Sequence, residues 1–229
     1  MKLKSHNRDF FFISVYNVTV GDIMKSIIVD LQCPSCMWHS QIMSDTLILS
    51  EFETDLKAQL KEGHYFHTIC PRCQTKIGYF HTCVYTDRQH GFVLLMKPRK
   101  EIKDADHLLY RKDAYIKRYL FSEDEIAEKM AILEADLDDR VIEILKVKLY
   151  LQAKKTKRLI MDIHFYDYDV KSESIWFCVE RQDTKDLLAV TLESYQTIQK
   201  TLTPMKTDGF YAVDLEWAIA YLKTKQNTR

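Results

Sequence analysis

The sequence predicts an α+β protein, and three observations carry that prediction. Two short Cys-Pro-x-Cys stretches, at residues 33–36 and 70–73, enclose a segment with strand-like and helix-like patterns. Helical periodicity then begins near residue 122, and from residue 158 the apolar residues alternate with a period of two, which is typical of half-buried strands. We therefore expect a zinc-ribbon-like antiparallel β module with an inserted helix, followed by helices and an antiparallel β meander.

The composition is that of a folded protein. A length of 229 residues suits one or two domains, and 46% hydrophobic residues with only 5 Gly and 4 Pro argue against disorder. Lys+Arg and Asp+Glu both number 33, so the strongly basic character typical of nucleic-acid binding is absent. No apolar run reaches the roughly 18 residues of a transmembrane helix, and no signal-peptide cleavage site is evident. We expect a cytoplasmic protein that does not associate with membranes.

Four cysteines form the candidate metal site. Two CxxC pairs in a cytoplasmic chain point to four thiolates around one Zn²⁺, so Cys33, Cys36, Cys70 and Cys73 are the predicted ligands. Four protein ligands leave no open position, which indicates a structural metal.

Two alternatives to this site stay open. A redox-active CxxC usually precedes a helix, whereas strand-like residues follow both pairs here. A nearby histidine could also replace one cysteine; the candidates are His39, His64, His67 and His81. The two remaining cysteines, Cys83 and Cys178, are expected to lie in the core.

Residues 24–99 are predicted to build the module around the cysteines, after an N-terminal extension of residues 1–23 with one strand over residues 10–20. Strands flank both Cys pairs, and a hairpin is expected to complete the sheet. The predicted strands cover residues 27–32, 38–43, 64–69, 76–86 and 92–96.

The inserted helix is predicted from a capping box. Ser50 would be the N-cap and Glu53 the acid at N3, and the helix would run to residue 62. Phe52, Leu56 and Leu60 fall on one face of that helix, and Gly63 follows it as the C′ residue.

Residues 100–229 are predicted to form a helical connector and an α+β C-terminal domain. The connector is expected to hold a short helix over residues 105–115, and Ser122 with Glu125 forms a second capping box. Helix N-capping is the interpretation of three acids that come next: Asp136, Asp138 and Asp139. Strands over residues 158–166, 175–181 and 187–191 form the meander, and helices follow over residues 192–202 and after Asp214.

In this order, the features resemble the CpXC family, a group of bacterial proteins named for two Cys-Pro-x-Cys motifs. Besides the Cys pairs, the matching features are an apolar strand at residues 27–31, Gly63 with Tyr65 and Phe66, Tyr85 and Asp87 before a hairpin, Pro98, and the stretch at residues 138–146. The resemblance covers roughly residues 27–148. It implies a metal-binding fold and assigns no reaction. One departure is that Met37 and Gln74 stand where zinc ribbons often have Gly.

Three functions remain open at this point. The expected one is a non-enzymatic zinc-binding protein that acts by binding a partner, most simply another protein. The alternative is a nucleic-acid-associated regulator that uses its zinc ribbon and the basic residues of segments 97–118 and 146–158. A weaker alternative is an enzyme with a site in the C-terminal half, although the chain has no Walker, GxGxxG, GxSxG or HExxH motif. The sequence makes no prediction of the oligomeric state.

Overall fold

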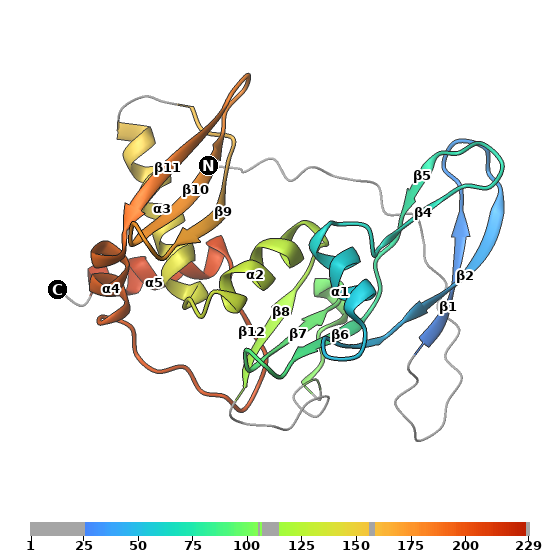
Figure 1. Ribbon diagram of the computed structural model, residues 1–229, viewed down its shortest axis with the longest axis horizontal. Helices are drawn as coiled ribbons and strands as arrows, with labels where there is room; N and C mark the ends of the chain where they lie inside the picture. The colour runs from blue at the N-terminus through green and yellow to red at the C-terminus, as the bar shows by residue number, and fades with distance from the viewer. Residues whose placement is uncertain (1–25, 105, 107–114, 156–158, 228–229) are drawn as a thin grey trace.

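The computed structural model confirms the α+β class and describes residues 26–104, 106, 115–155 and 159–227. Two β-hairpins that carry the cysteines lie at one end of the molecule, and a three-stranded sheet with helices lies at the other (Figure 1). A five-stranded sheet lies between them. The strand predicted over residues 10–20 lies outside the described residues, and so does most of the helix predicted over residues 105–115.

Each Cys-Pro-x-Cys stretch forms the loop of one hairpin. Strand β1 (Ser26–Gln32) pairs antiparallel with β2 (His39–Asp45), and β4 (His67–Ile69) pairs antiparallel with β5 (Lys76–Gly78). In β1 the burial alternates along the strand: Val29 and Leu31 are buried, whereas Ile28 is exposed and Asp30 is half-buried. The predicted pairing of strands around each Cys pair is therefore present.

The third predicted hairpin belongs to a different sheet, which corrects the expectation that it completes the cysteine module. The five-stranded sheet has the order β12-β8-β7-β6-β3. Its strands are β3 (Leu47–Leu49), β6 (Cys83–Asp87), β7 (Phe92–Met96), β8 (Ile116–Leu120) and β12 (Tyr211–Ala212). Only β6 and β7 are antiparallel neighbours. The separation arises at residues 79–82, where Tyr79, Phe80 and His81 turn into the core and end the strand begun at β5.

Residues 116–118, which were predicted to end a basic connector, instead belong to strand β8. This strand pairs with β7 on one side and β12 on the other, and two of its basic side chains are buried, with Lys117 only 2% and Arg118 only 5% exposed. Buried Lys and Arg are rare unless paired, which is why the basic sequence indicated a surface segment. A 3-10 turn, η1 (Arg99–Glu101), precedes this region. The sheet and its core thus continue past residue 99, the predicted end of the first module.

Both predicted capping boxes start their helices later than expected. Helix α1 (Thr54–Lys61) has Glu53 at its N-cap and α2 (Asp124–Glu134) has Glu123, and neither N-cap side chain bonds its own helix. Instead Glu53 accepts a hydrogen bond from the Leu49 N–H (2.7 Å), and Glu125 accepts one from the Phe121 N–H (3.1 Å). In each case the glutamate reaches the residue before the serine, so the serine lies in a turn.

The late start of α1 also displaces Phe52. It precedes the helix and is 75% exposed, whereas Leu56 and Leu60 pack on the core as predicted. A residue with a left-handed backbone conformation follows both α1 and α2. Gly63 (φ +66°) follows α1, and the His64 N–H donates to the Gln59 carbonyl (2.8 Å). Asp136 (φ +54°) follows α2 in the same way, which corrects its predicted role as an N-cap acid.

Two hydrophobic cores meet at α2. Ile126, Met130 and Leu133 pack into the first core, which lies between the five-stranded sheet, α1 and the hairpin β1–β2. Ile132 packs into the second core together with α3 (Asp139–Lys155) and the meander. The remaining elements of this half are β9 (Asp162–Asp169), β10 (Ser174–Glu180), β11 (Lys185–Thr191), α4 (Leu192–Gln199) and α5 (Leu215–Asn227). None of the described helices has the length and apolar character needed to cross a bilayer.

Candidate metal centre

The two Cys-Pro-x-Cys loops, which we call the knuckles, have the same backbone hydrogen bonds. In the first, the Cys33 N–H donates to the Trp38 carbonyl (2.8 Å) and the Met37 N–H to the Cys33 carbonyl (2.9 Å). In the second, the Cys70 N–H donates to the Thr75 carbonyl (2.9 Å) and the Gln74 N–H to the Cys70 carbonyl (3.0 Å). Each knuckle thus closes its hairpin with one defined turn.

Met37 and Gln74 have left-handed backbones, with φ of +58° and +61°. The turn therefore requires at these positions the conformation that glycine adopts at least cost, although neither residue is glycine. Their side chains point to solvent, where no packing opposes the conformation.

The four predicted cysteines converge. Their sulfurs all lie within 4.8 Å of one another, with Cys33 Sγ 3.5 Å from Cys73 Sγ and Cys36 Sγ 3.7 Å from Cys70 Sγ. Sulfurs about 2.3 Å from a tetrahedral zinc ion would lie about 3.8 Å apart, so the spacing fits a four-coordinate ion. All four cysteines are free thiols, and among the described residues they are the one set of His, Cys and acidic side chains close enough to share an ion. Four close cysteines can hold a metal ion here.

The two knuckles present their sulfurs differently. Cys33 and Cys70, the first cysteine of each pair, are buried, whereas Cys73 is exposed. The hydroxyl and backbone N–H of Thr75 bond the Cys73 sulfur and lower the pKa of its thiol to about 6. The Trp38 N–H likewise favours the thiolate of Cys36, but desolvation and the neighbouring thiols raise the pKa of Cys36 to about 12.

Neither alternative interpretation of the cysteines finds support in this geometry. Both knuckles lead into strands, so no helix N-terminus activates a thiol in the way expected of a redox CxxC. The four histidines also have other partners: His39 bonds Gln32, His64 lies beside Glu62, His67 pairs with Glu123, and His81 bonds Ser44 and Thr82.

One of these histidines connects the metal module to the first core. Glu123, at the start of α2, lies 3.0 Å from His67 Nδ1 and accepts a hydrogen bond from the Phe66 N–H (3.2 Å). This use of its carboxylate explains why Glu123 does not cap α2. The second knuckle is therefore attached directly to the helix that joins the two cores.

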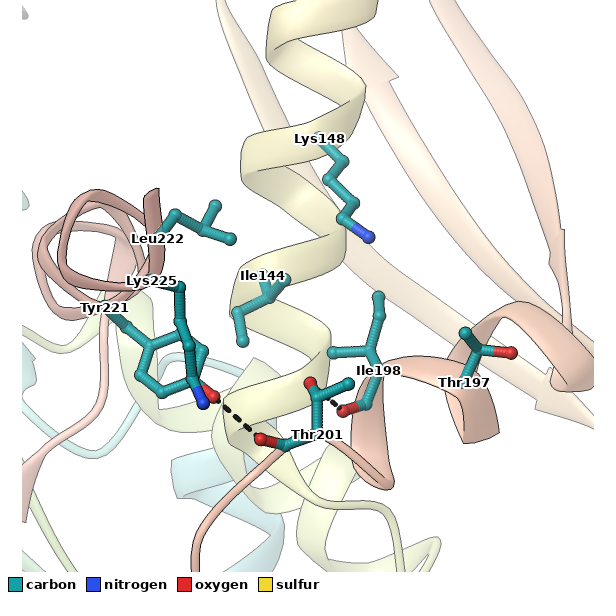
Figure 2. A pocket seen from close by; sticks show the side chains of 8 residues that line it. All are labelled: Ile144, Lys148, Thr197, Ile198, Thr201, Tyr221, Leu222 and Lys225. Carbon is teal, nitrogen blue, oxygen red and sulfur yellow. Dashed lines mark hydrogen bonds between the residues drawn. The ribbon is translucent and has the colours of Figure 1, made fainter. Parts of the chain in front are cut away.

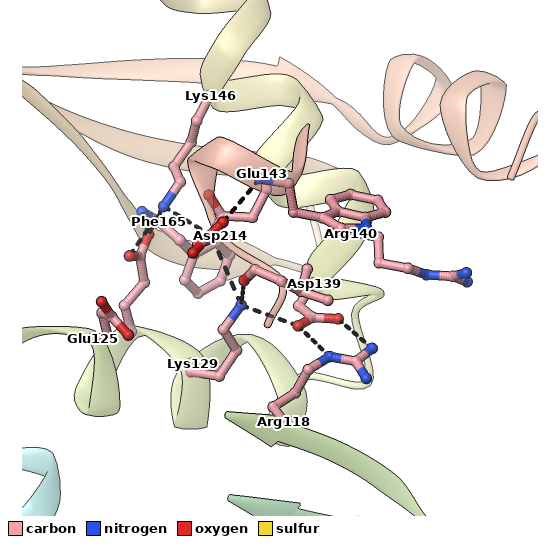
Figure 3. A network of polar contacts seen from close by, with 12 residues as sticks. Arg118, Glu125, Lys129, Asp139, Arg140, Glu143, Lys146, Phe165 and Asp214 are labelled. Atoms are coloured by element: carbon pink, nitrogen blue, oxygen red, sulfur yellow. Dashed lines mark hydrogen bonds and ion pairs between the residues drawn. The ribbon is translucent and has the colours of Figure 1, made fainter. Parts of the chain in front are cut away.

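A second polar cluster, which sequence reasoning missed, lies between α2 and α3 (Figure 3). Asp139 binds Arg118 through two hydrogen bonds (2.8 and 2.9 Å) and Lys129 at 3.0 Å. From Lys129 the chain of ion pairs continues through the next charged side chains to the edge of β9, in the order Glu143, Lys146, Glu128, His164 and Asp162. We call this set of eight residues the charge network.

The charge network corrects the interpretation of Asp139 as a helix-capping acid. Asp138 is the N-cap of α3, since it accepts the Arg140 N–H (3.0 Å), whereas Asp139 is buried. Burial alone would raise the pKa of Asp139, but Lys129 and Arg118 hold it well below its usual range. The sequence signal that could have revealed this network is the pair of basic residues inside the apolar pattern of β8.

The outer part of the network borders a small polar pocket of about 240 Å³. Burial raises the pKa of Glu125 and Glu143, which line it. Burial would do the same to Glu128, but His164, Lys146 and the Phe165 N–H lower its pKa to about 2. The alternating charges of the network neutralise one another, as a structural connection between two cores requires.

The comparisons with known proteins agree with the metal centre. Residues 31–146, just over half of the 229 residues, match the model of a family described as CpXC protein. Searches of curated proteins and of solved structures found no match. The matching segment begins two residues before the first knuckle and ends in α3, so it contains all four converging cysteines, and the chain belongs to the CpXC family.

Proposed function

We propose that Cys33, Cys36, Cys70 and Cys73 bind one structural Zn²⁺ and that the module held together by this ion binds a partner protein. The observation that carries the first part is the convergence of four sulfurs within 4.8 Å from two knuckles of the same geometry. An all-thiolate set favours zinc over the hard cations Mg²⁺ and Ca²⁺, and it leaves no coordination position for a substrate.

The hairpins have little else to hold them together. Around the sulfurs, the buried cluster contains only Cys33, Cys70 and Ile77, with Cys36 packed against it. A metal bond between sulfurs 34 to 40 positions apart would close the loop between the knuckles and remove entropy from the unfolded chain. The bound ion therefore contributes directly to folding of this end of the molecule.

The outward face of the first hairpin supports the second part of the proposal. Ile28 and Met43 lie directly opposite each other on β1 and β2 and are 56% and 77% exposed. Met37 and Trp38, at the knuckle end of the same hairpin beyond the polar pairs Asp30–Gln41 and Gln32–His39, are also exposed. Exposed apolar side chains grouped on one rigid hairpin are typical of protein-binding surfaces, in which Trp and Met are enriched. We call these four residues the hairpin face.

Metal analysis tests the zinc site. Protein purified without chelator should contain about one zinc per chain, and Cys70→Ser should lose it. The matched control is Cys178→Ser, because Cys178 is a partly exposed free cysteine outside the site. A Cys70→Ser protein that keeps a full zinc equivalent would overturn the proposal.

Site-specific photo-crosslinking in cells tests the hairpin face. A photoreactive amino acid at Met43 should give a discrete adduct with one protein, and adding Trp38→Ser should reduce its yield. Val170, which is 69% exposed on the opposite half of the molecule, provides the control position. Equal adducts at both positions, or none at Met43, would contradict a partner on this face.

The nucleic-acid alternative receives less support from the arrangement of basic residues. Lys97 is paired with Asp106, Arg99 with Asp214, and Lys117, Arg118 and Lys146 are buried. These residues were the centre of the predicted basic surface, and they face inward or toward acids. Salt-dependent retention of the protein on nucleic acid would revive this alternative.

A further inference from the structure

A pocket of about 330 Å³ lies between α3, α4 and α5, in the second core and outside both the metal site and the charge network (Figure 2). Its volume is at the lower end of the range for small-molecule sites, about 300 to 1,000 Å³. Ile144 of α3 forms the floor, Ile198 closes the side toward α4, and Leu222 closes the side toward α5.

The wall of the pocket is apolar, and its polar atoms are already bonded. Ile144 and Ile198 are 1% and 6% exposed, so the packing of the second core around them holds their side chains in place. The Thr201 hydroxyl donates to the Ile198 carbonyl (2.7 Å), and the Tyr221 hydroxyl donates to the Thr201 carbonyl (3.1 Å). The Thr197 hydroxyl donates to the Glu193 carbonyl (2.8 Å). The three hydroxyl groups of the wall therefore already have hydrogen-bond acceptors, which favours an apolar ligand.

The rim carries positive charge. Lys148 extends from α3 above Ile144, and Lys225 folds over the Tyr221 ring with its Nζ 5.7 Å from the ring centre (Figure 2). None of the eight described residues that line the pocket is acidic, and neither lysine has an ion-pair partner among the described residues. Both lysines are therefore available to a negatively charged ligand at the mouth of the pocket.

We propose that this pocket binds a small amphipathic carboxylate, with its apolar chain between Ile144, Ile198 and Leu222 and its carboxylate at Lys148 and Lys225. A phosphate fits less well, because the pocket offers neither an arginine for a two-point contact nor the N–H groups of a helix N-terminus. The end of α4 that borders the pocket is its C-terminus, whose carbonyls disfavour negative charge and penalise a doubly charged phosphate more than a monoanion. The two lysines must offset this effect, which a single carboxylate requires less of than a phosphate does.

A titration of the full-length, zinc-loaded protein with sodium octanoate tests the site. Isotope-labelled methyl groups of Ile144, Ile198 and Leu222 should shift and reach saturation at one octanoate per chain. Loss of two partly solvated ion pairs should make the double variant Lys148→Met and Lys225→Met bind octanoate about 2- to 30-fold more weakly. Its methionines keep the apolar stems, and its melting temperature should match that of the wild type.

The control variant is Lys154→Met with Lys223→Met, which removes two exposed lysines from the same two helices and should leave octanoate binding unchanged. Octylamine has the same chain with the opposite charge and should bind more weakly than octanoate. Octylamine binding as tight as octanoate, equal binding by the double variant, or methyl shifts that never saturate would each overturn the proposal. An acidic peptide that shifts these methyls when octanoate does not would overturn the small-molecule ligand in favour of a protein partner.

Discussion

Met37 and Gln74 occupy the same position in the two knuckles, and their backbones have nearly the same left-handed φ, +58° and +61°. Each donates its N–H to the carbonyl of the first cysteine of its own knuckle. The equivalence shows that the turn, and not the side chain, determines the conformation. A residue with a Cβ pays a conformational cost here that glycine does not.

Glycine at these two positions should stabilise the metal-bound protein. A left-handed residue with a Cβ costs about 1–2 kcal/mol, partly offset by the greater freedom of glycine in the unfolded chain. We expect Met37→Gly and Gln74→Gly each to raise the free energy of unfolding by about 0.5–1 kcal/mol, measured by urea unfolding at fixed zinc. The matched controls Ser35→Gly and Arg72→Gly lie in the same knuckles at negative φ and should destabilise; gains at all four positions would refute the backbone explanation.

Removal of the metal should loosen one end of the molecule first. Hydrogen exchange measured after EDTA treatment should accelerate at the amides of β1, β2, β4 and β5, because the cluster around the cysteines contains few apolar side chains. Amides of β10 should keep their protection, since Ile175, Phe177 and Val179 are buried in the second core. Uniform acceleration over both regions would instead indicate that the metal supports the whole fold.

Asp138 and Asp139 are neighbours in sequence but should differ sharply on substitution. Asp139→Asn leaves the buried charges of Arg118 and Lys129 without their carboxylate, and we expect a loss of about 3–5 kcal/mol. Asp138→Asn keeps a side chain that caps α3 and weakens only a half-buried pair with Arg140, so the loss should be smaller, about 1 kcal/mol. Equal losses in urea unfolding would contradict the assignment of Asp139 to the charge network.

The outer charge network should limit stability at both pH extremes. The pKa of Glu128 is lowered to about 2, so its contribution is complete above an unfolded pKa of about 4.3 and is lost as the pH falls through about 2. Asp162 and Glu128 raise the pKa of His164 to about 10. Its contribution is therefore complete below about pH 6.5 and is lost as the pH rises through about 10.

Unfolding free energies measured across pH separate these two groups. His164→Gln should remove the decline between about pH 6.5 and 10, and it should weaken the acid decline without abolishing it, because Lys146 and the Phe165 N–H still bond Glu128. His64→Gln serves as the control, because His64 is an exposed histidine beside Glu62. A wild-type alkaline decline that survives in His164→Gln would assign it to another group.

Local patterns predicted much of this structure. The knuckles, the strand before the first cysteine, the buried face of α2 and the meander each follow from residues close together in sequence. The convergence of Cys33, Cys36, Cys70 and Cys73 follows as well, because two knuckles with one shared ligand chemistry have few other arrangements.

The wrong predictions have two physical causes, which are pairing between residues far apart in sequence and an unexpected partner of a glutamate within a turn. Strand β8 was interpreted as a basic connector because Arg118 finds its counter-charge in Asp139, 21 positions away and in another element. The helices of the two Ser-x-x-Glu patterns begin later than predicted, by three residues in α1 and by one in α2, because each glutamate bonds the residue before the serine. No local pattern reports the partner of Arg118.

The five-stranded sheet depends on strand β12, which comes late in the sequence. Tyr211 and Ala212 cover the outer edge of β8 at Arg118 and Tyr119, and the Val213 carbonyl accepts a hydrogen bond from Lys129 (2.7 Å). A fragment that stopped at residue 146, where the family match ends, would leave β8 as an open edge and remove this acceptor from a buried lysine. During synthesis, the five-stranded sheet therefore cannot be completed until Ala212 has left the ribosome.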